Sequence, residues 1–148
     1  MHSFNSCLIY CVWSTKNHVP VLNSNLRERL WPYLAGIARE NGMKALAVGG
    51  VIDHVHILIS LRATLSVARA IQLLKGNSSK WIHEAFSNRA LFGWQEGYGA
   101  FSIGVSGVEA TKRYIRNQAE HHRKRTFREE LRIMLRRHGL EYDERMLD

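Results

Sequence analysis

Two histidines, His54 and His56, lie one residue apart in a run of the sequence that is rich in β-branched residues. Such residues favour an extended chain, in which successive side chains point to opposite faces, so both imidazoles are predicted to project from one face of a strand. Two imidazoles on one rigid strand form half of a site for a divalent metal ion. The same pattern also fits two surface histidines on a half-solvated strand, and alone it does not decide between these interpretations.

A second candidate group lies in a later segment with helical spacing. Tyr114 and Gln118 are four residues apart and therefore share a helix face, with His121 and His122 one turn further on. A phenol, an amide, imidazoles and the nearby Arg116 suit phosphate chemistry. On structural grounds alone, Tyr114 is more typical of an ordinary packing residue whose hydroxyl reaches the surface.

The elements that must position these groups follow from hydrophobic periodicity. Strands are predicted over residues 7–13, 43–48, 53–61 and 100–105, and helices over 26–40, 65–86, 107–124 and 126–139. The first strand is apolar on both faces and should be central in its sheet. This order is the split βαβ pattern, an α+β, ferredoxin-like (RRM-like) antiparallel sheet with helices on one face, plus C-terminal helices. Residues 1–125 are interpreted as the part of the domain that holds both candidate groups, and residues 126–148 as its basic C-terminal helix and tail.

Local signals refine these elements. The residues of the histidine strand that alternate with the histidines are predicted to face the core, and they are Val55, Ile57, Ile59 and Leu61. Ser106-x-x-Glu109 and Thr126-x-x-Glu129 are capping boxes that should open the last two helices. The tail from residue 140 is acidic enough to fold back on the arginines of the last helix.

Residues 76–79 (GNSS) are predicted to break the second helix, with a restart at Lys80. The new helix terminus would present backbone N–H groups beside Lys75 and Lys80, which suits a phosphate group. A solvated helix kink explains the same residues equally well. Aromatic residues of the following loop, Phe92, Trp94 and Tyr98, are expected to cover the core, although loop aromatics also stack on unpaired bases.

Composition limits the class of protein. The 148 residues fit one domain, and 45% hydrophobic with 23% charged residues is typical of a globular chain. A formal charge of +8 and a pI of about 9.9 favour a polyanionic partner such as nucleic acid, or serve solubility. No run approaches the roughly twenty apolar residues that span a bilayer, and no signal peptide is evident, so we expect a cytoplasmic protein without a membrane partner. Cys7 and Cys11 are expected to be reduced core residues.

Five segments, taken together, resemble one known family. They span nearly the whole chain, and the combination of His-x-His with Tyr-x-x-x-Gln and a Lys-Gly-x-Ser-Ser element is highly specific. The segments are VWSTK at 12–16, DHVH at 53–56, LKGNSS at 74–79, WQEGYGAFS at 94–102 and YIRNQAEHH at 114–122. In these segments the chain resembles the single-tyrosine HUH transposases of bacterial and archaeal insertion sequences, which include IS200-like and REP-associated members.

The resemblance implies an enzyme, a transposase that cuts and rejoins single-stranded DNA. Tyr114 would be the catalytic nucleophile and would form a 5′-phosphotyrosine intermediate. The metal ligands would be His54, His56 and Gln118, holding Mg²⁺ or Mn²⁺. A phenol with a pKa near 10 is a poor nucleophile at neutral pH, so a site of this kind must activate it.

The resemblance also implies partners. Family members recognise DNA hairpins at the ends of their element and form homodimers, and in several the tyrosine helix of one subunit completes the metal site of the other. The resemblance therefore implies a homodimer here too, and we carry over as a hypothesis that its two subunits share their active sites. The candidate DNA-binding residues here are Lys75, Ser78, Ser79, Lys80, Arg113, Arg116, Arg123, Lys124 and Arg125.

Two rival functions remain open from the sequence. The first is a nucleic-acid-binding module with a ferredoxin-like fold and no catalysis, although an aromatic RNP signature is not evident. The second is a small metal-dependent hydrolase in which His54 and His56 act with water and Tyr114 takes no part in the reaction. Formation of a covalent protein–DNA adduct would separate the transposase from both.

Overall fold

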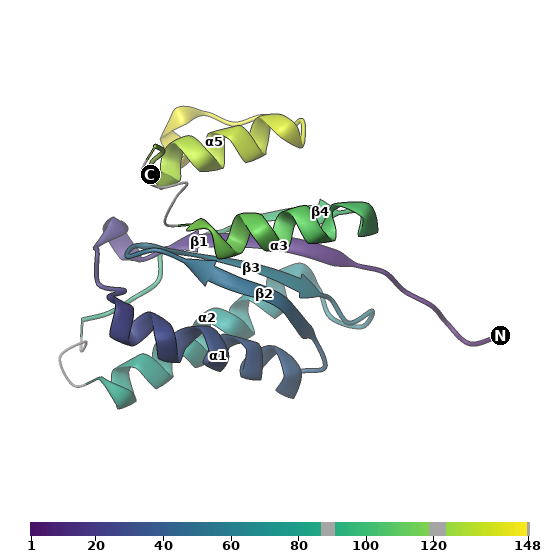
Figure 1. Ribbon diagram of the computed structural model, residues 1–148, viewed down its shortest axis with the longest axis horizontal. Coiled ribbons are helices and arrows are strands. Elements are labelled where there is room, and N and C mark those ends of the chain that lie inside the picture. The colour runs from purple at the N-terminus through teal and green to yellow at the C-terminus, as the bar shows by residue number, and fades with distance from the viewer. Residues whose placement is uncertain (87–90, 119–123, 148) are drawn as a thin grey trace.

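The computed structural model describes residues 1–86, 91–118 and 124–147 and contains four strands among several helices (Figure 1). The main elements in chain order are β1 (Leu8–Ser14), α1 (Ser24–Glu40), β2 (Lys44–Gly50), β3 (His54–Ser60), α2 (Val67–Ala85), β4 (Gly99–Ile103), α3 (Val108–Arg116) and α5 (Phe127–Arg137). Short 3₁₀ helices are η1 (Lys16–His18), η3 (Val105–Gly107) and η4 (Glu144–Leu147).

The four strands form one antiparallel sheet with the order β2-β3-β1-β4. This is the predicted ferredoxin-like arrangement, and β1 is central, as its apolar sequence indicated. In the register between β1 and β3, Ser14 lies opposite His54 and Val12 lies opposite His56. The histidine strand is therefore paired on both sides, which fixes the direction of its side chains.

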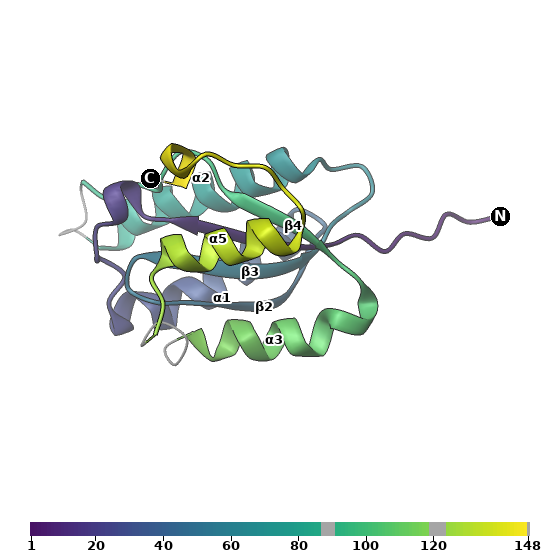
Figure 2. The same cartoon turned by 90° about the horizontal axis from the view of Figure 1, so that it is seen from above.

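Helices cover both faces of the sheet. Helices α1 and α2 lie on one face, and α3 and α5 lie on the other (Figures 1 and 2). Val55, Ile57 and Ile59 are fully buried in the core under α1 and α2, which confirms the predicted inward row of β3. His54 and His56 point to the opposite face, where α3 and α5 bury them completely. The half-solvated strand with two surface histidines is thus the wrong interpretation.

The predicted break in the second helix is wrong, because α2 is continuous from its N-cap Ser66 to Ala85. Polar side chains in this stretch bond to carbonyls of the preceding turn. Asn77 Nδ2 donates to Leu73 O at 2.9 Å, and Ser78 Oγ donates to Lys75 O at 3.1 Å. Bonds of this type let such residues remain inside a helix, so no restart supplies a phosphate-binding terminus.

The two predicted capping boxes have different outcomes. Thr126 caps α5 as predicted, since its Oγ1 accepts a hydrogen bond from Glu129 N at 3.2 Å. Ser106 does not cap α3, because it lies inside η3 and the N-cap is Gly107 with helical backbone angles. A capping side chain needs an extended backbone at its own residue, which the 3₁₀ turn denies to Ser106.

Helix α3 ends at Arg116, with Asn117 as its C-cap, well before residue 124 where the periodicity predicted its end. The remainder of that predicted helix falls on residues 119–123, outside the described part of the chain.

The C-terminal tail folds back on α5, as the charge pattern predicted. Glu144 Oε2 lies 2.7 Å from Arg132 Nη2 and 3.4 Å from Arg128 Nη2. Phe127, Leu131 and Met134 form the inner side of α5 and pack on the sheet. None of the helices within the described ranges has the length and apolar character that crossing a membrane requires.

Candidate active site

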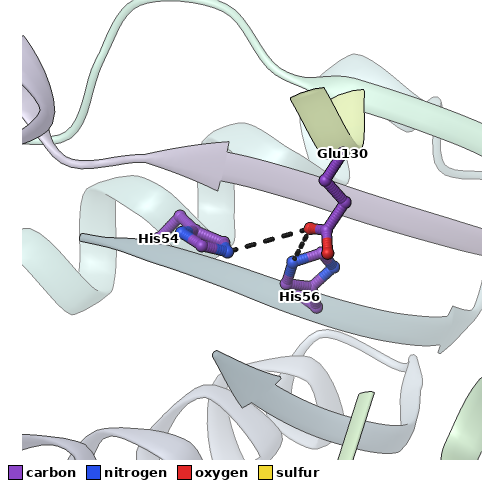
Figure 3. A group of neighbouring side chains, drawn as sticks. All are labelled: His54, His56 and Glu130. Atoms are coloured by element: carbon purple, nitrogen blue, oxygen red, sulfur yellow. Dashed lines mark ion pairs between the residues drawn. The ribbon is translucent and has the colours of Figure 1, made fainter. Parts of the chain in front are cut away.

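Three buried side chains from two distant parts of the chain meet above the sheet (Figure 3). His54 and His56 come from β3, and Glu130 comes from α5. Glu130 Oε1 lies 2.7 Å from His56 Nε2 and 3.8 Å from His54 Nε2. Relative exposures of 0%, 0% and 2% leave all three side chains out of contact with bulk water. The cluster is therefore a shielded polar centre rather than a surface ion pair.

Each imidazole is held from behind through its other ring nitrogen. His54 Nδ1 lies 2.7 Å from Asp53 Oδ1, and His56 Nδ1 lies 2.5 Å from the hydroxyl of Tyr10. Figure 3 shows that the remaining nitrogens of the two rings both face the Glu130 carboxylate. Contacts of this kind fix the orientation of histidines that bind metals, because the second nitrogen is occupied.

Glu130 reaches the histidines because of its place on α5. Phe127, Glu130, Leu131 and Met134 follow the i, i+3, i+4, i+7 spacing of one helix face. Phe127 packs against the His54 ring with centroids 4.7 Å apart, and this contact fixes the start of the helix over β3. The same face that supplies apolar contacts thus carries one carboxylate into the site.

The structure brings Tyr114 to this centre within the same chain. Its hydroxyl donates a hydrogen bond to Glu130 Oε2, and its ring lies 6.1 Å from the His56 ring. Burial, followed by the hydrogen bond to Glu130, raises the pKa of Tyr114 above its ordinary value. The phenol is therefore neutral at physiological pH, and its proton is directed at the carboxylate.

A close helix–strand contact positions Tyr114. Gly49 of β2 lies under Ile115, and a Cβ at Gly49 would come within 2.4 Å of the Ile115 carbonyl oxygen. Ile115 is fully buried. Because Gly49 has no side chain, the backbone of α3 can pack directly against the sheet. Tyr114, the residue before Ile115, then lies beside the histidines.

The residues present fit a divalent metal ion. The candidate ligand atoms of His54, His56 and Glu130 all lie within 4.8 Å of one another. Two imidazoles and a carboxylate are a donor set used for first-row divalent ions, and carboxylate oxygen also suits Mg²⁺ and Mn²⁺. The rear contacts to Asp53 and Tyr10 leave the two inward nitrogens for this purpose.

Gln118, the predicted third ligand, lies one turn after Tyr114 and is 2% exposed. Its Nε2 donates to Tyr114 O at 3.1 Å. Its Oε1 is buried and has no hydrogen-bond partner among the residues that the structure describes. A buried amide oxygen without a partner is costly unless another group binds it. The structure thus provides Glu130 as a metal-ligand candidate in addition to Gln118.

The predicted DNA-binding residues do not form one surface. Lys75, Ser78, Ser79 and Lys80 belong to α2, on the sheet face opposite the histidines, whereas Arg113, Arg116, Lys124 and Arg125 are exposed near α3 and α5. Arg123, with His121 and His122, lies outside the described residues.

Lys75 and Ser78 bind their own chain. Lys75 Nζ donates to Gln95 O at 2.6 Å and to Gly97 O at 2.9 Å, and Ser78 Oγ accepts from Trp94 Nε1 at 3.0 Å. The loop that they hold reaches the end of β1, where Gln95 Oε1 accepts from Ser14 N at 2.5 Å. Phe92 and Trp94 of this loop cover the core, as expected, while Tyr98 is 44% exposed.

Sequence reasoning missed Glu130. The only local signal was a carboxylate inside the apolar stripe of the last helix, between Phe127 and Leu131. Such a residue is costly to bury without a partner, so its position in the stripe could have indicated a cation or a proton donor opposite it. The partner of the Glu130 carboxylate depends on where α5 crosses the sheet, and hydrophobic periodicity does not predict the path of a helix over a sheet.

Comparison with known proteins decides the family of this fold and site. The family described as IS200-like transposases matches residues 3–118. The chain belongs to the IS200-like transposase family. The ISDra2 transposase TnpA of Deinococcus radiodurans is 25% identical over 114 residues, which cover 74% of this chain and 81% of that protein. The family match ends at Gln118, so α5 and Glu130 lie beyond it.

Solved structures support the same fold. A transposase crystal structure from Deinococcus radiodurans superposes on this IS200-like chain with a TM-score of 0.66 at 23% identity, covering 80% of this chain and 95% of that one. A REP-associated tyrosine transposase bound to a REP hairpin gives a TM-score of 0.61 at 13% identity, covering 82% and 72%. The four-stranded α+β architecture is therefore that of tyrosine transposases.

Proposed function

We propose that this IS200-like transposase is a metal-dependent endonuclease and strand transferase of single-stranded DNA, with Tyr114 as the nucleophile. One observation carries the proposal. The Tyr114 hydroxyl and the His56 imidazole contact the two oxygens of a single carboxylate, Glu130, in a buried site. A phenol beside a proton acceptor and a histidine pair is an arrangement suited to phosphodiester transfer to that phenol, because the acceptor can take the phenolic proton.

The proposed step is a displacement at phosphorus. Tyr114 Oη attacks the phosphorus atom, its proton passes to Glu130 Oε2, and a new bond joins the phenolic oxygen to phosphorus. The bond from phosphorus to the 3′ oxygen breaks, and that oxygen leaves with the electron pair and takes a proton from solvent to become a 3′-OH. The product is a 5′-phosphotyrosine. Because the phosphodiester is conserved, a second 3′-OH reverses the step and reseals DNA without ATP.

His54, His56 and Glu130 would hold the divalent ion, Mg²⁺ or Mn²⁺, and the unpartnered amide oxygen of Gln118 is available as a further ligand. A bound divalent ion supplies charge neutralisation at a non-bridging phosphate oxygen. The chain's own contribution is to keep both imidazoles aimed inward through Asp53 and Tyr10. Burial also excludes water that would compete with the phenol.

The substrate is proposed to be single-stranded DNA beside a hairpin at the ends of an insertion sequence. The REP-associated relative bound to a hairpin supports this substrate class. The net charge of +8 and the exposed Arg113, Arg116, Lys124 and Arg125 near the site supply phosphate contacts that do not depend on sequence. We place the enzyme in the cytoplasm, where its DNA would be.

The test is incubation of the full chain with labelled single strands from the ends of its own element and Mn²⁺, followed by a denaturing gel. The proposal predicts a covalent protein–DNA adduct that is absent without the ion and absent in Tyr114→Phe. Tyr33→Phe, an exposed tyrosine on α1, is the matched control and keeps the adduct. Strand cleavage without an adduct would instead support a water-dependent hydrolase, and binding alone a non-catalytic module.

A further inference from the structure

A cavity of about 700 Å³ lies between α3, α5 and the strands β1 and β4, next to the proposed active site. Figure 2 shows α5 across the sheet with α3 beside it. Tyr114 and Glu130 both line the cavity, so it is continuous with the place where the phosphate would react. Its volume lies within the range of small-molecule sites and is too small for a folded partner.

One wall of the cavity is aromatic. Phe101 of β4 is 4% exposed, and the ring of His138 lies over it with centroids 4.8 Å apart and planes inclined by 33°. His138 itself is exposed, so its imidazole is the accessible surface of this pair. Flat rings at the edge of a cavity provide a stacking surface for an unpaired base.

The cavity also carries excess positive charge. The positively charged residues that line it are Lys124, Arg125 and Arg137. Among the described residues of the lining, Glu130 is the one carboxylate, and it already contacts Tyr114 and His56. A ligand that combines a flat apolar face with negative charge matches this lining, and a nucleotide has both features. An apolar peptide or a lipid tail carries no negative charge that could contact these three cations.

We propose that the cavity between α3 and α5 holds one unpaired nucleotide of the substrate strand, directly beside the phosphate that Tyr114 attacks. Its base would pack on His138 over Phe101, and Arg137 would contact its phosphate. This inference rests on the proposed function, because it takes the substrate to be single-stranded DNA. It adds a base-dependent subsite to the phosphate contacts already proposed for this surface.

The experiment measures binding rather than cleavage. The full chain, without added metal, is titrated with single-stranded pentamers of deoxyadenylate, deoxycytidylate and thymidylate, and with a pentamer of abasic deoxyribose phosphate. The readouts are the dissociation constant and the NMR signals of the His138 ring. We expect at least one base-containing pentamer to bind roughly tenfold more tightly than the abasic one and to shift the His138 signals.

Two variants localise the effect. His138→Ala should abolish the difference between the base-containing and abasic pentamers. Arg137→Ala should weaken all pentamers several-fold, whereas Arg136→Ala, which removes the same charge one residue away and outside the cavity, should weaken them less. Equal affinity for all pentamers, or a base-dependent gain that survives His138→Ala, would overturn the inference.

The result also separates this inference from the proposed function. Base-dependent binding without any covalent adduct would contradict the strand-transfer activity and leave the subsite standing. An adduct without base-dependent binding would contradict the subsite alone.

Discussion

Glu130 is the residue at which the Tyr114 hydroxyl and the histidine pair meet. One carboxylate oxygen accepts from Tyr114 and the other contacts His56, so the side chain is placed for both roles that we propose for it, proton transfer and ligand donation. It lies outside the segment that the family matches, so the role that we propose for it is argued from geometry alone.

Replacing Glu130 tests this dual role. Glu130→Gln keeps the size of the side chain but removes the charge, so it should lower the rate of adduct formation roughly 100-fold. The measurement is the single-turnover rate with Mn²⁺. Glu129→Gln, the exposed neighbour on the same helix, is the matched control and should change the rate little. An unchanged or faster rate in Glu130→Gln would show that the carboxylate does not assist the reaction.

Individual residues differed in how far the sequence could predict them. His54, His56 and Tyr114 stood out because their types and spacing carry chemistry locally. Glu130 did not, since its function depends on the path of α5 over the sheet. The contacts of Lys75 were also not predictable. Its ammonium binds a backbone carbonyl twenty residues away, and a backbone carbonyl is present whatever the residue type at that position.

Lys75 provides a prediction of its own. Its ammonium joins α2 to the loop that reaches β1, and burial lowers its pKa. Lys75→Met should lower the free energy of unfolding by about 1–3 kcal/mol, because two carbonyls lose a charged donor. Urea denaturation measures this change. Lys80→Met, on the exposed side of the same helix, should have little effect, and equal stability of the two variants would contradict the structural role.

At the level of elements, the strand–helix order was predictable because each element has its own hydrophobic period. The predicted break in α2 failed because Gly and Ser were interpreted by their general preferences. In the structure Asn77 and Ser78 bond to carbonyls of their own helix. Such bonds are made within one turn of the helix. Whether they form also depends on the residues that the helix packs against, and here Trp94 Nε1 donates a hydrogen bond to Ser78 Oγ.

The contact between α3 and β2 is the element-level feature on which Tyr114 depends. Gly49→Ala would place a methyl group against the Ile115 carbonyl oxygen, and overpacking of this kind costs about 1–3 kcal/mol. We expect lower stability in urea and slower adduct formation, because α3 must move away from the histidines. Gly76→Ala is the control, since a Cβ there meets nothing within 4 Å. If both variants behave like the wild type, α3 does not depend on this contact.

At the level of the whole molecule, Tyr114 reaches the histidine pair within its own chain, through the Glu130 carboxylate that both contact. We therefore expect each active site to be complete within a subunit, whether or not the protein forms the homodimer that its family implies. Equimolar mixtures of His54→Ala and Tyr114→Phe should then form no adduct, because neither chain holds both groups. Recovery of activity in verified mixed dimers would show that subunits exchange the tyrosine helix.

The central claim is that the Tyr114 phenol becomes covalently joined to DNA in the presence of a divalent ion. The most direct measurement is peptide mapping by mass spectrometry after incubation with single-stranded substrate and Mn²⁺ and digestion with protease and nuclease. The account predicts a nucleotide mass on Tyr114 that is absent when Mn²⁺ is omitted. A cleaved substrate with unmodified Tyr114, or a nucleotide on a different residue, would contradict it.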